Sequence, residues 1–344
     1  MHIDINHRAG TLNGILFVAL LALAAIYLAR IPTLLYLKIS PLIVGIVLGM
    51  VYANTLRMNF PDSWNPGVTF SAKKILRLAI ILYGFRITFQ QIGDVGAVGL
   101  TVAVVMVSST FLLGSWVGVR FFKMDRDTAM LTAAGSSICG AAAVLATEPV
   151  LKAAPQKSAT AVSTVVLFGT ISMFLYPALY GLGVIHLTPP EYGVYVGGSV
   201  HEVAQVVAAG GAIPGAADNA VIVKMTRVML LAPALVLLGI YVSRMAAKGK
   251  DKAGSVKLVI PWFAVGFIAA AGINSLNILP HQLVAWIIVI DTFLLTMAMT
   301  ALGMETSYSK LKDVGVKPVY LALVLFAWLV VGGYAVTNLA LRLF

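Results

Sequence analysis

Three polar side chains, His201, Glu202 and Gln205, lie within an apolar segment that begins at Gly197 and ends at Gly211. Long uncharged stretches on either side predict a place near the middle of a bilayer, where an ionisable group is costly unless it is paired or faces water. The glycines would let the helix unwind towards a cavity. We expect His201 and Glu202 to couple a proton or cation and Gln205 to bind substrate. A polar cluster that only locks helix packing is the alternative.

A second group of small polar side chains, Ser136, Ser137 and Cys139, lies between Gly135 and Gly140. If the helix breaks here, freed amides and hydroxyls at the N-terminus of a half-helix would bind an anion without any full charge. A packing face of small residues is the alternative. No base can be assigned to Cys139, so the sequence predicts no catalytic nucleophile.

Lys224 and Arg227 are three residues apart and share one face of a helix inside the membrane. Arginine binds oxyanions through two parallel hydrogen bonds, so the pair could clamp an oxyanion, act as counter-charges to Glu202 and Asp291, or alternate between these partners. Asp291 lies in another apolar run and is expected to carry a proton or to pair with one of the two cations. Four charged residues near the ends of spans are expected to be solvated caps: Arg86, Asp94, Glu305 and Asp313.

The composition determines the class of the protein. Of its 344 residues, 60% are hydrophobic and 11% are charged, with a mean hydropathy of +0.95, which is typical of an integral membrane protein. The net charge of +11 falls in short loops and indicates membrane orientation rather than nucleic-acid binding. A single cysteine excludes an intramolecular disulfide and a multi-cysteine metal site. The sequence has no nucleotide-binding motif, so we expect no cofactor, no metal and no enzyme activity.

Apolar runs long enough to cross a bilayer recur along the chain and predict an all-α membrane protein with one transporter domain over residues 1–344. About eleven transmembrane helices are expected, at 11–29, 39–56, 73–93, 95–119, 128–150, 157–182, 191–212, 218–243, 258–276, 281–303 and 318–341. The fifth and seventh are the Gly/Ser-rich helices expected to be discontinuous. No signal-peptide cleavage site follows the first run, so we expect it to be retained.

Lysine and arginine collect on one side of this topology. Sixteen lie on the side of the N-terminus and six, which include Lys152 and Lys157, lie on the other side. Lys224 and Arg227 remain inside a span. Because positive charge favours the cytoplasmic side, the N-terminus is expected in the cytoplasm and the C-terminus outside.

Two internal similarities predict inverted repeats. Residues 83–96 align with residues 302–315 and keep an Asp-Val-Gly sequence at the same position. Residues 135–144 resemble residues 198–207 more weakly, and a helix led by lysine follows each stretch. The first pair is antiparallel in the eleven-helix topology, as in many secondary transporters. The two pairings do not define one repeat register.

Three sequence blocks, in this order, resemble the YeiH-type inner-membrane proteins, a family named as sulfate exporters: Gly135–Ala143, Gly198–Gly210 and Val223–Pro233. The similarity covers nearly the whole chain. The family is similar in plan to the bile-acid symporter and sodium/proton antiporter superfamily. The resemblance therefore implies a multi-pass transporter in the lipid bilayer of the bacterial inner membrane, without a nucleic-acid partner.

These observations predict a secondary active transporter that exports a small inorganic or organosulfur oxyanion, such as sulfate or sulfite, coupled to protons or sodium. The candidate substrate-binding residues are Ser136, Ser137, Cys139, Ser199, Gln205, Lys224 and Arg227, and the candidate ion-coupling residues are His201, Glu202 and Asp291. A cation/proton antiporter of the same fold is the alternative, which the two basic residues disfavour. A membrane-embedded enzyme is a remote alternative because no nucleophile or full metal-ligand set is present. The sequence is compatible with a homodimer.

Overall fold

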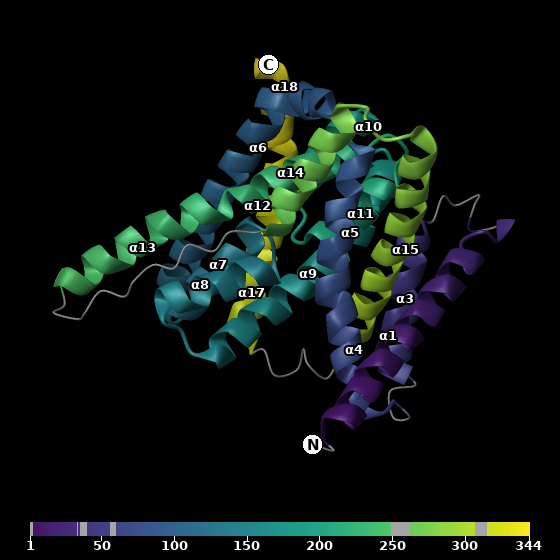
Figure 1. The fold of residues 1–344 in the computed structure, drawn as a ribbon. Coiled ribbons are helices and arrows are strands. Elements are labelled where there is room, and N and C mark those ends of the chain that lie inside the picture. The colour runs from purple at the N-terminus through teal and green to yellow at the C-terminus, as the bar shows by residue number, and fades with distance from the viewer. Residues whose placement is uncertain (1–2, 33, 35–39, 56–59, 249–261, 307–314) are drawn as a thin grey trace. The chain divides into compact units, whose positions relative to one another are not determined.

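The structure, a computed structural model, describes residues 3–32, 34, 40–55, 60–248, 262–306 and 315–344. Every regular element in these residues is a helix, which confirms the predicted all-α class. The chain forms two compact units (Figure 1): unit 1 comprises residues 1–91 and 263–309, and unit 2 comprises residues 92–262 and 310–344. The expected transporter domain is therefore divided internally, and each unit is built from two separate stretches of sequence.

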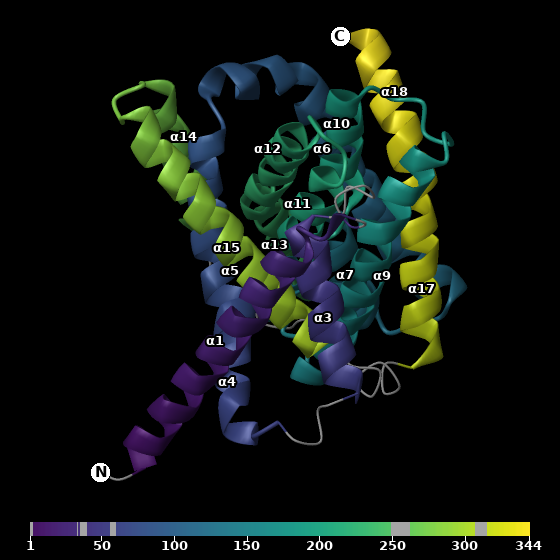
Figure 2. The same ribbon diagram turned by 90° about the vertical axis from the view of Figure 1, so that its right-hand side faces the viewer.

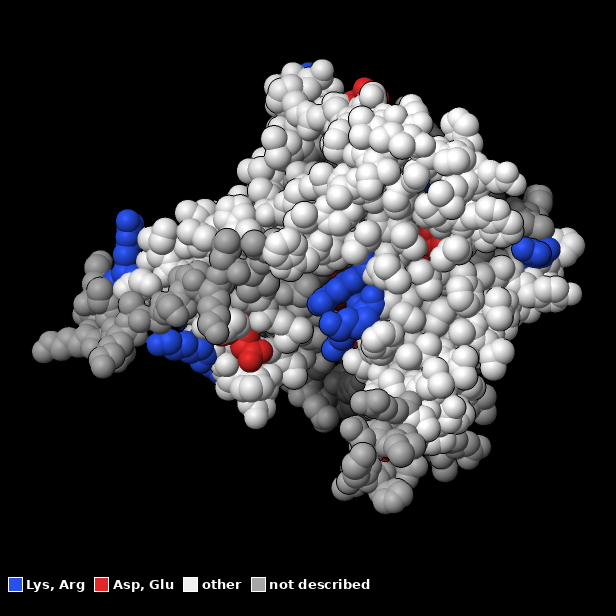
Figure 3. Space-filling view, viewed as in Figure 1, with Lys and Arg blue, Asp and Glu red and all other residues white. Residues whose placement is uncertain are grey.

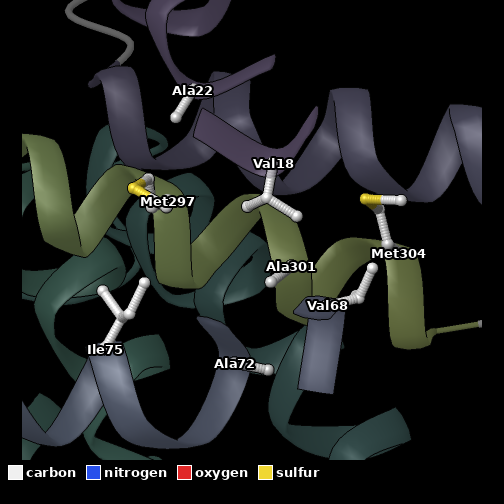
Figure 4. Packing of buried hydrophobic residues seen from close by; sticks show 8 residues of the cluster. All are labelled: Val18, Ala22, Val68, Ala72, Ile75, Met297, Ala301 and Met304. Carbon is white, nitrogen blue, oxygen red and sulfur yellow. The ribbon is translucent and has the colours of Figure 1, made fainter. Parts of the chain in front are cut away.

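Unit 1 contains the first helices of the chain and two later ones. They are α1 (Ile3–Leu28), α3 (Pro41–Thr55), α4 (Asn65–Phe70), α5 (Leu76–Tyr83), α14 (Trp262–Ser275) and α15 (His281–Glu305). One π-helical turn at Ser71–Ile75 joins α4 to α5. Figure 4 shows the core in which α1, α15 and this joined helix meet, formed by Val18, Ala22, Val68, Ala72, Ile75, Met297, Ala301 and Met304. The alanines in this core let the helices approach closely, as at helix contacts in membranes.

Among the residues that the structure describes, six helical segments are long and apolar enough to cross a membrane: Ala9–Leu28, Phe89–Phe121, Pro155–Gly181, Ala217–Arg244, His281–Glu305 and Val316–Leu343. Large apolar side chains on them are exposed, for example Leu20 (65%), Leu112 (66%) and Leu237 (69%). The face drawn in Figure 3 is mostly uncharged, with charged side chains in a few small groups. So much exposed apolar surface requires contact with lipid, and the chain is a multi-pass membrane protein.

Unit 2 contains both of the predicted discontinuous helices. Its elements are α6 (Phe89–Trp116), α7 (Arg126–Ser137), α8 (Ala141–Leu151), α9 (Pro155–Gly181), α10 (Pro189–Ser199), α11 (Val203–Gly211), α12 (Ala217–Met229), α13 (Leu231–Lys248), α17 (Val316–Ala327) and α18 (Gly333–Leu343). The two discontinuities are confirmed, between α7 and α8 and between α10 and α11. Both broken helices, however, fold back on themselves.

The first hairpin consists of α7 and α8. A Cβ atom on Gly135 would lie only 2.7 Å from Val144 Cγ2, so the two helices run side by side near their junction. At the open end, Lys157 in the first turn of α9 binds Asp125 Oδ1 at 2.6 Å and Asp127 Oδ2 at 2.8 Å, both at the start of α7. The start of α7 and the end of α8 therefore lie at the same end of unit 2, and the prediction that residues 128–150 cross the membrane is wrong.

The second hairpin consists of α10 and α11. The hydroxyl of Tyr192, early in α10, donates to the carbonyl of Ala209 near the end of α11 at 3.4 Å. Asn219 in the first turn of α12 donates to the carbonyl of Pro190 at 3.2 Å. α9 has 27 residues and a length of about 40 Å, and it separates the open ends of the two hairpins. Residues 191–212 therefore re-enter as well, from the opposite end of unit 2.

The two hairpins belong to similar halves of unit 2. α6 packs on both hairpins, because Gly114 faces Ala133 of α7 and Val102 faces Gly198 of α10. The yellow rod of α17 and α18 in Figure 2 also packs on both, through α7 and α10. α6 comes before the hairpin of the first half, whereas α17 and α18 come after the hairpin of the second half. This permuted order explains why the sequence similarities share no register, although part of one similarity, residues 307–314, lies outside the described residues.

Candidate functional site

The tip of the first hairpin is the break at residues 138–140. Gly140 has a φ of +73°, which side chains with a Cβ rarely adopt, and a Cβ there would lie 2.3 Å from Glu202 Cγ. Ser136 and Ser137 form the last turn of α7. They therefore lie at the C-terminus of a half-helix, which attracts cations. The half-helix N-terminus expected in this stretch is that of α8, which begins at Ala141, so the two serines lie before it and not in its first turn.

The tip of the second hairpin is the extended segment at residues 200–202. Val200 and Glu202 have ψ angles of 148° and 153°. Gly197 and Gly198, where unwinding was expected, stay helical. A Cβ on Gly197 would lie 2.3 Å from the carbonyl oxygen of Ala220, so this glycine permits the close approach of α10 and α12. The helix instead breaks at the residues that carry the polar side chains.

Lys224 of α12 joins the two tips. Its side chain is fully buried, and Nζ donates to the carbonyl oxygens of Ile138 at 2.6 Å, Val200 at 2.9 Å and His201. The three carbonyl acceptors around Nζ match the three N–H donors of an ammonium group. The backbone of both hairpin tips thus binds one ammonium group.

Arg227, one turn further along α12, binds the ends of both entering helices. Nε and Nη2 donate to the carbonyl of Ser137 at 3.2 and 2.6 Å, and Nη2 also reaches Ser136 at 3.4 Å. Nη1 donates to the carbonyls of Gly197 and Val200 at 3.1 and 3.0 Å. Each of the five N–H groups of the guanidinium therefore has a carbonyl partner. The two cations neutralise the C-terminal dipoles of α7 and α10.

Glu202 supplies the matching negative charge for the N-termini of the returning helices. Its Oε1 accepts a hydrogen bond from the amide of Ala141, the first residue of α8, at 3.1 Å. It also forms a capping box with Gln205 at the start of α11, in which Gln205 Oε1 accepts from the Glu202 amide at 3.0 Å. A carboxylate at two helix N-termini is favourable because both ends carry partial positive charge. Glu202 is only half-buried, unlike the two cations.

Three buried polar atoms at the hairpin tips have no hydrogen-bond partner among the described residues: Ser136 Oγ, His201 Nδ1 and Gln205 Nε2. All three side chains are at most 1% exposed. Buried polar groups without partners are rare and costly in folded proteins, except where a ligand or water binds them. The hydroxyl of Ser199, by contrast, donates to the carbonyl of Tyr195 at 2.5 Å, and Cys139 is a buried free thiol.

Asp291 lies in unit 1 and pairs with Arg86, not with Lys224 or Arg227. Arg86 Nε lies 2.8 Å from Asp291 Oδ2, and its Nη2 donates to Thr292 Oγ1 at 2.7 Å. Asp291 is fully buried and Arg86 is 25% exposed. The prediction of Arg86 as a solvated cap is therefore wrong. Because 205 residues separate the partners, no local sequence pattern could have indicated the pair.

Two further sequence predictions can be compared with the described residues. Glu305 accepts a hydrogen bond from Thr69 Oγ1 at 2.8 Å and so has a specific partner rather than solvent alone. No group of three His, Cys, Asp or Glu side chains with metal-binding geometry occurs in the part of the chain that the structure describes. Asp313 lies outside the described residues.

Comparison with known proteins identifies the family. The family described as Conserved hypothetical protein 698 matches residues 13–322. A UPF0324 membrane protein of Bordetella pertussis is 54% identical over 330 residues, which cover 96% of this chain and 95% of the relative. The UPF0324 inner membrane protein YeiH of Escherichia coli K12 is 50% identical over 324 residues, with 94% and 92% coverage. No solved structure matches the chain. The protein therefore belongs to the UPF0324 family of membrane proteins, the family of YeiH.

Proposed function

We propose that this protein is a secondary active transporter that moves a small oxyanion across the membrane together with a proton. The observation that carries this proposal is the meeting of two re-entrant hairpin tips on Lys224 and Arg227, within one unit. Irregular backbone at membrane depth is tolerated where it is buried in protein or lines a cavity, and transporters use such broken helices to build substrate and ion sites.

The charge balance at the tips favours an anion. Lys224 and Arg227 carry two positive charges, and Glu202 is the carboxylate that reaches the tips among the described residues. The four half-helix ends add no net charge, because two carbonyl ends cancel two amide ends. One positive charge thus remains when Glu202 is ionised. A cation/proton antiporter, the alternative, would have to add a cation to this excess of positive charge.

Glu202 acts in this proposal as an internal anion that the substrate replaces. Its carboxylate occupies the Ala141 amide at the N-terminus of α8, and such an N-terminus binds oxyanions. Protonation of Glu202 weakens that hydrogen bond and releases the amide to the substrate. The unpaired atoms of Ser136, His201 and Gln205 offer further hydrogen bonds. Lys224 and Arg227 attract the anion through their charge, while their N–H groups stay on the backbone.

The predicted direction follows from the charge that is moved. A divalent oxyanion such as sulfate or sulfite, accompanied by one proton, carries one net negative charge. A membrane potential that is negative inside favours its outward movement by about 2.3 kcal/mol per 100 mV. This direction agrees with the resemblance to sulfate exporters.

The two hairpins also strengthen the bias in Lys and Arg from which the membrane orientation is predicted. If residues 126–151 and 189–211 re-enter, Lys152 and Lys157 move to the side of the N-terminus. The bias in Lys and Arg then rises from sixteen against six to eighteen against four. Because two crossings are lost, the N-terminus stays in the cytoplasm and the C-terminus outside.

The test is uptake of radiolabelled sulfate and sulfite into proteoliposomes under an imposed pH or sodium gradient. Wild-type protein should concentrate at least one anion when the proton gradient is inward. Glu202→Gln cannot exchange a proton, so it should lose this uptake but retain exchange of labelled for unlabelled anion. The matched control is Glu191→Gln, which changes the capping carboxylate at the other end of α10. Gradient-driven uptake by Glu202→Gln, or dependence on sodium alone, would refute proton coupling.

A further inference from the structure

A cavity of about 740 Å³ in unit 2 lies between α6, the first hairpin and α13, and Glu202 is not among the residues that line it. α13 follows α12 directly, and Pro233 in its first turn has no N–H to donate to the helix. Figure 1 shows α13 running out to one side of unit 2. The volume lies within the range of about 300–1,000 Å³ that is common for sites of small ligands.

The cavity opens towards lipid. Several apolar side chains that line it are strongly exposed, namely Leu112 (66%), Trp116 (64%), Leu237 (69%) and Tyr241 (51%). Trp and Tyr favour the depth of the lipid headgroups. Since the rim is apolar and lies on membrane helices, the molecule that enters from this side must have a hydrocarbon part.

One end of the cavity is basic. Arg120 and Arg126 line it there, and the Arg126 guanidinium lies 5.1 Å from the centre of the Tyr241 ring. Arg126 Nη2 is buried and has no hydrogen-bond partner among the described residues. The neighbouring carboxylates of Asp125 and Asp127 are both bound by Lys157. At this end of the cavity, the Arg126 guanidinium therefore has a positive charge and an N–H donor available to a ligand.

The length of the cavity matches one leaflet. Its lining runs along α7 from Arg126 to Ser137, or about 16 Å of helix. Half of the hydrocarbon core measures about 15 Å. We propose that this cavity is a binding site for an anionic phospholipid, with its phosphate on Arg126 and an acyl chain between α6 and α13. The lipid would then reach the first hairpin tip.

The experiment is native mass spectrometry of the full-length protein with phosphatidylglycerol or phosphatidylcholine of the same acyl chains. Wild type should retain phosphatidylglycerol preferentially, and Arg126→Gln should reduce this preference about fivefold, the loss expected for one basic contact near the membrane surface. Arg77→Gln, an exposed arginine of unit 1, is the matched control and should leave it unchanged. Ala234→Phe, which fills the cavity without a charge change, should lower retention of phosphatidylglycerol.

Three results would overturn the proposal. Equal retention of the two lipids by wild type would mean that the cavity does not select charge. Equal losses in Arg126→Gln and Arg77→Gln would mean that only general surface charge matters. Displacement of bound phosphatidylglycerol by inorganic phosphate at comparable concentration would mean that the site binds a free anion rather than a lipid.

Discussion

At the scale of single residues, Lys224 and Arg227 have two roles: they hold the hairpin tips together, and they carry positive charge into the site. Each N–H of both side chains binds a backbone carbonyl at a hairpin tip, so neither could be removed without leaving acceptors unpaired in a buried place. Their charges still act on whatever binds nearby. The sequence predicted that these two residues matter, and the structure adds backbone carbonyl partners that no local sequence pattern indicates.

Replacement of Lys224 by methionine tests this account. The substitution preserves the approximate length of the side chain but leaves three buried carbonyls without a hydrogen-bond donor. It should therefore lower the free energy of unfolding by on the order of 3 kcal/mol or more. Thr226→Val, which removes a hydroxyl bonded within its own helix, should cost less than about 1 kcal/mol. Denaturant unfolding in detergent measures both. Equal losses would show that Lys224 does not hold the tips.

The same scale shows what the sequence could and could not reveal. His201, Glu202 and Gln205 were predicted from polar residues in an apolar setting, and the structure brings them to one hairpin tip. The pairing of Arg86 with Asp291 was missed because the partners are distant in sequence. The unpaired Ser136 hydroxyl was also beyond sequence reasoning, since only packing decides which hydroxyls find partners.

At the scale of elements, the breaks were predictable and the hairpins were not. Gly140 marks its break through a positive φ that favours glycine. Hydropathy, however, counts only apolar length, and two half-helices that return to one side are together as long as one crossing. The distinction depends on long-range contacts such as those of Lys157 with Asp125 and Asp127.

The open end of the first hairpin has a predictable pH dependence. Partial burial would raise the pKa of Asp125, but hydrogen bonds from Lys157 and Thr128 hold it below the ordinary value of 3.8. A lowered pKa in the folded state stabilises the protein above about pH 4, and this contribution is lost as the pH falls through the folded pKa. Asp125→Asn keeps an N-cap but loses the charge.

The variant should therefore be less stable than wild type near neutral pH, and the difference should disappear in more acidic solution. Thermal unfolding of both proteins across this pH range measures the effect. Asp94→Asn, an exposed carboxylate at the start of α6, serves as the control and should show no such change. A difference between Asp125→Asn and wild type that persists at acidic pH would contradict the role of the ion pair.

At the scale of the whole molecule, re-entry of both hairpins reverses the side of one loop. With the N-terminus in the cytoplasm, as proposed, eleven crossings would place Val184 in the cytoplasm, whereas two re-entrant hairpins would place it outside. Val184 is 58% exposed, and Cys139 is a buried thiol, so a new surface cysteine can be labelled selectively. Val184→Cys should react with a membrane-impermeant maleimide in intact cells.

Two positions calibrate the labelling because both topologies place them alike. Leu276→Cys should be labelled from outside, and Lys123→Cys should be labelled only after permeabilisation. Protection of Val184→Cys in intact cells, with Leu276→Cys labelled, would restore the eleven-crossing topology. That result would contradict the entry of the two hairpins from opposite sides of the membrane, on which the proposed site depends.

The central claim is that an oxyanion replaces the Glu202 carboxylate at the hairpin tips. Calorimetric titration of purified protein with sulfate and sulfite, in buffers of different ionisation enthalpy, counts the protons bound with each anion. The account predicts uptake of one proton per anion and an affinity that rises up to about tenfold for each unit of falling pH. Glu202→Gln should bind without proton uptake. Binding of the anion to wild type without proton uptake, or undiminished uptake in Glu202→Gln, would contradict the claim.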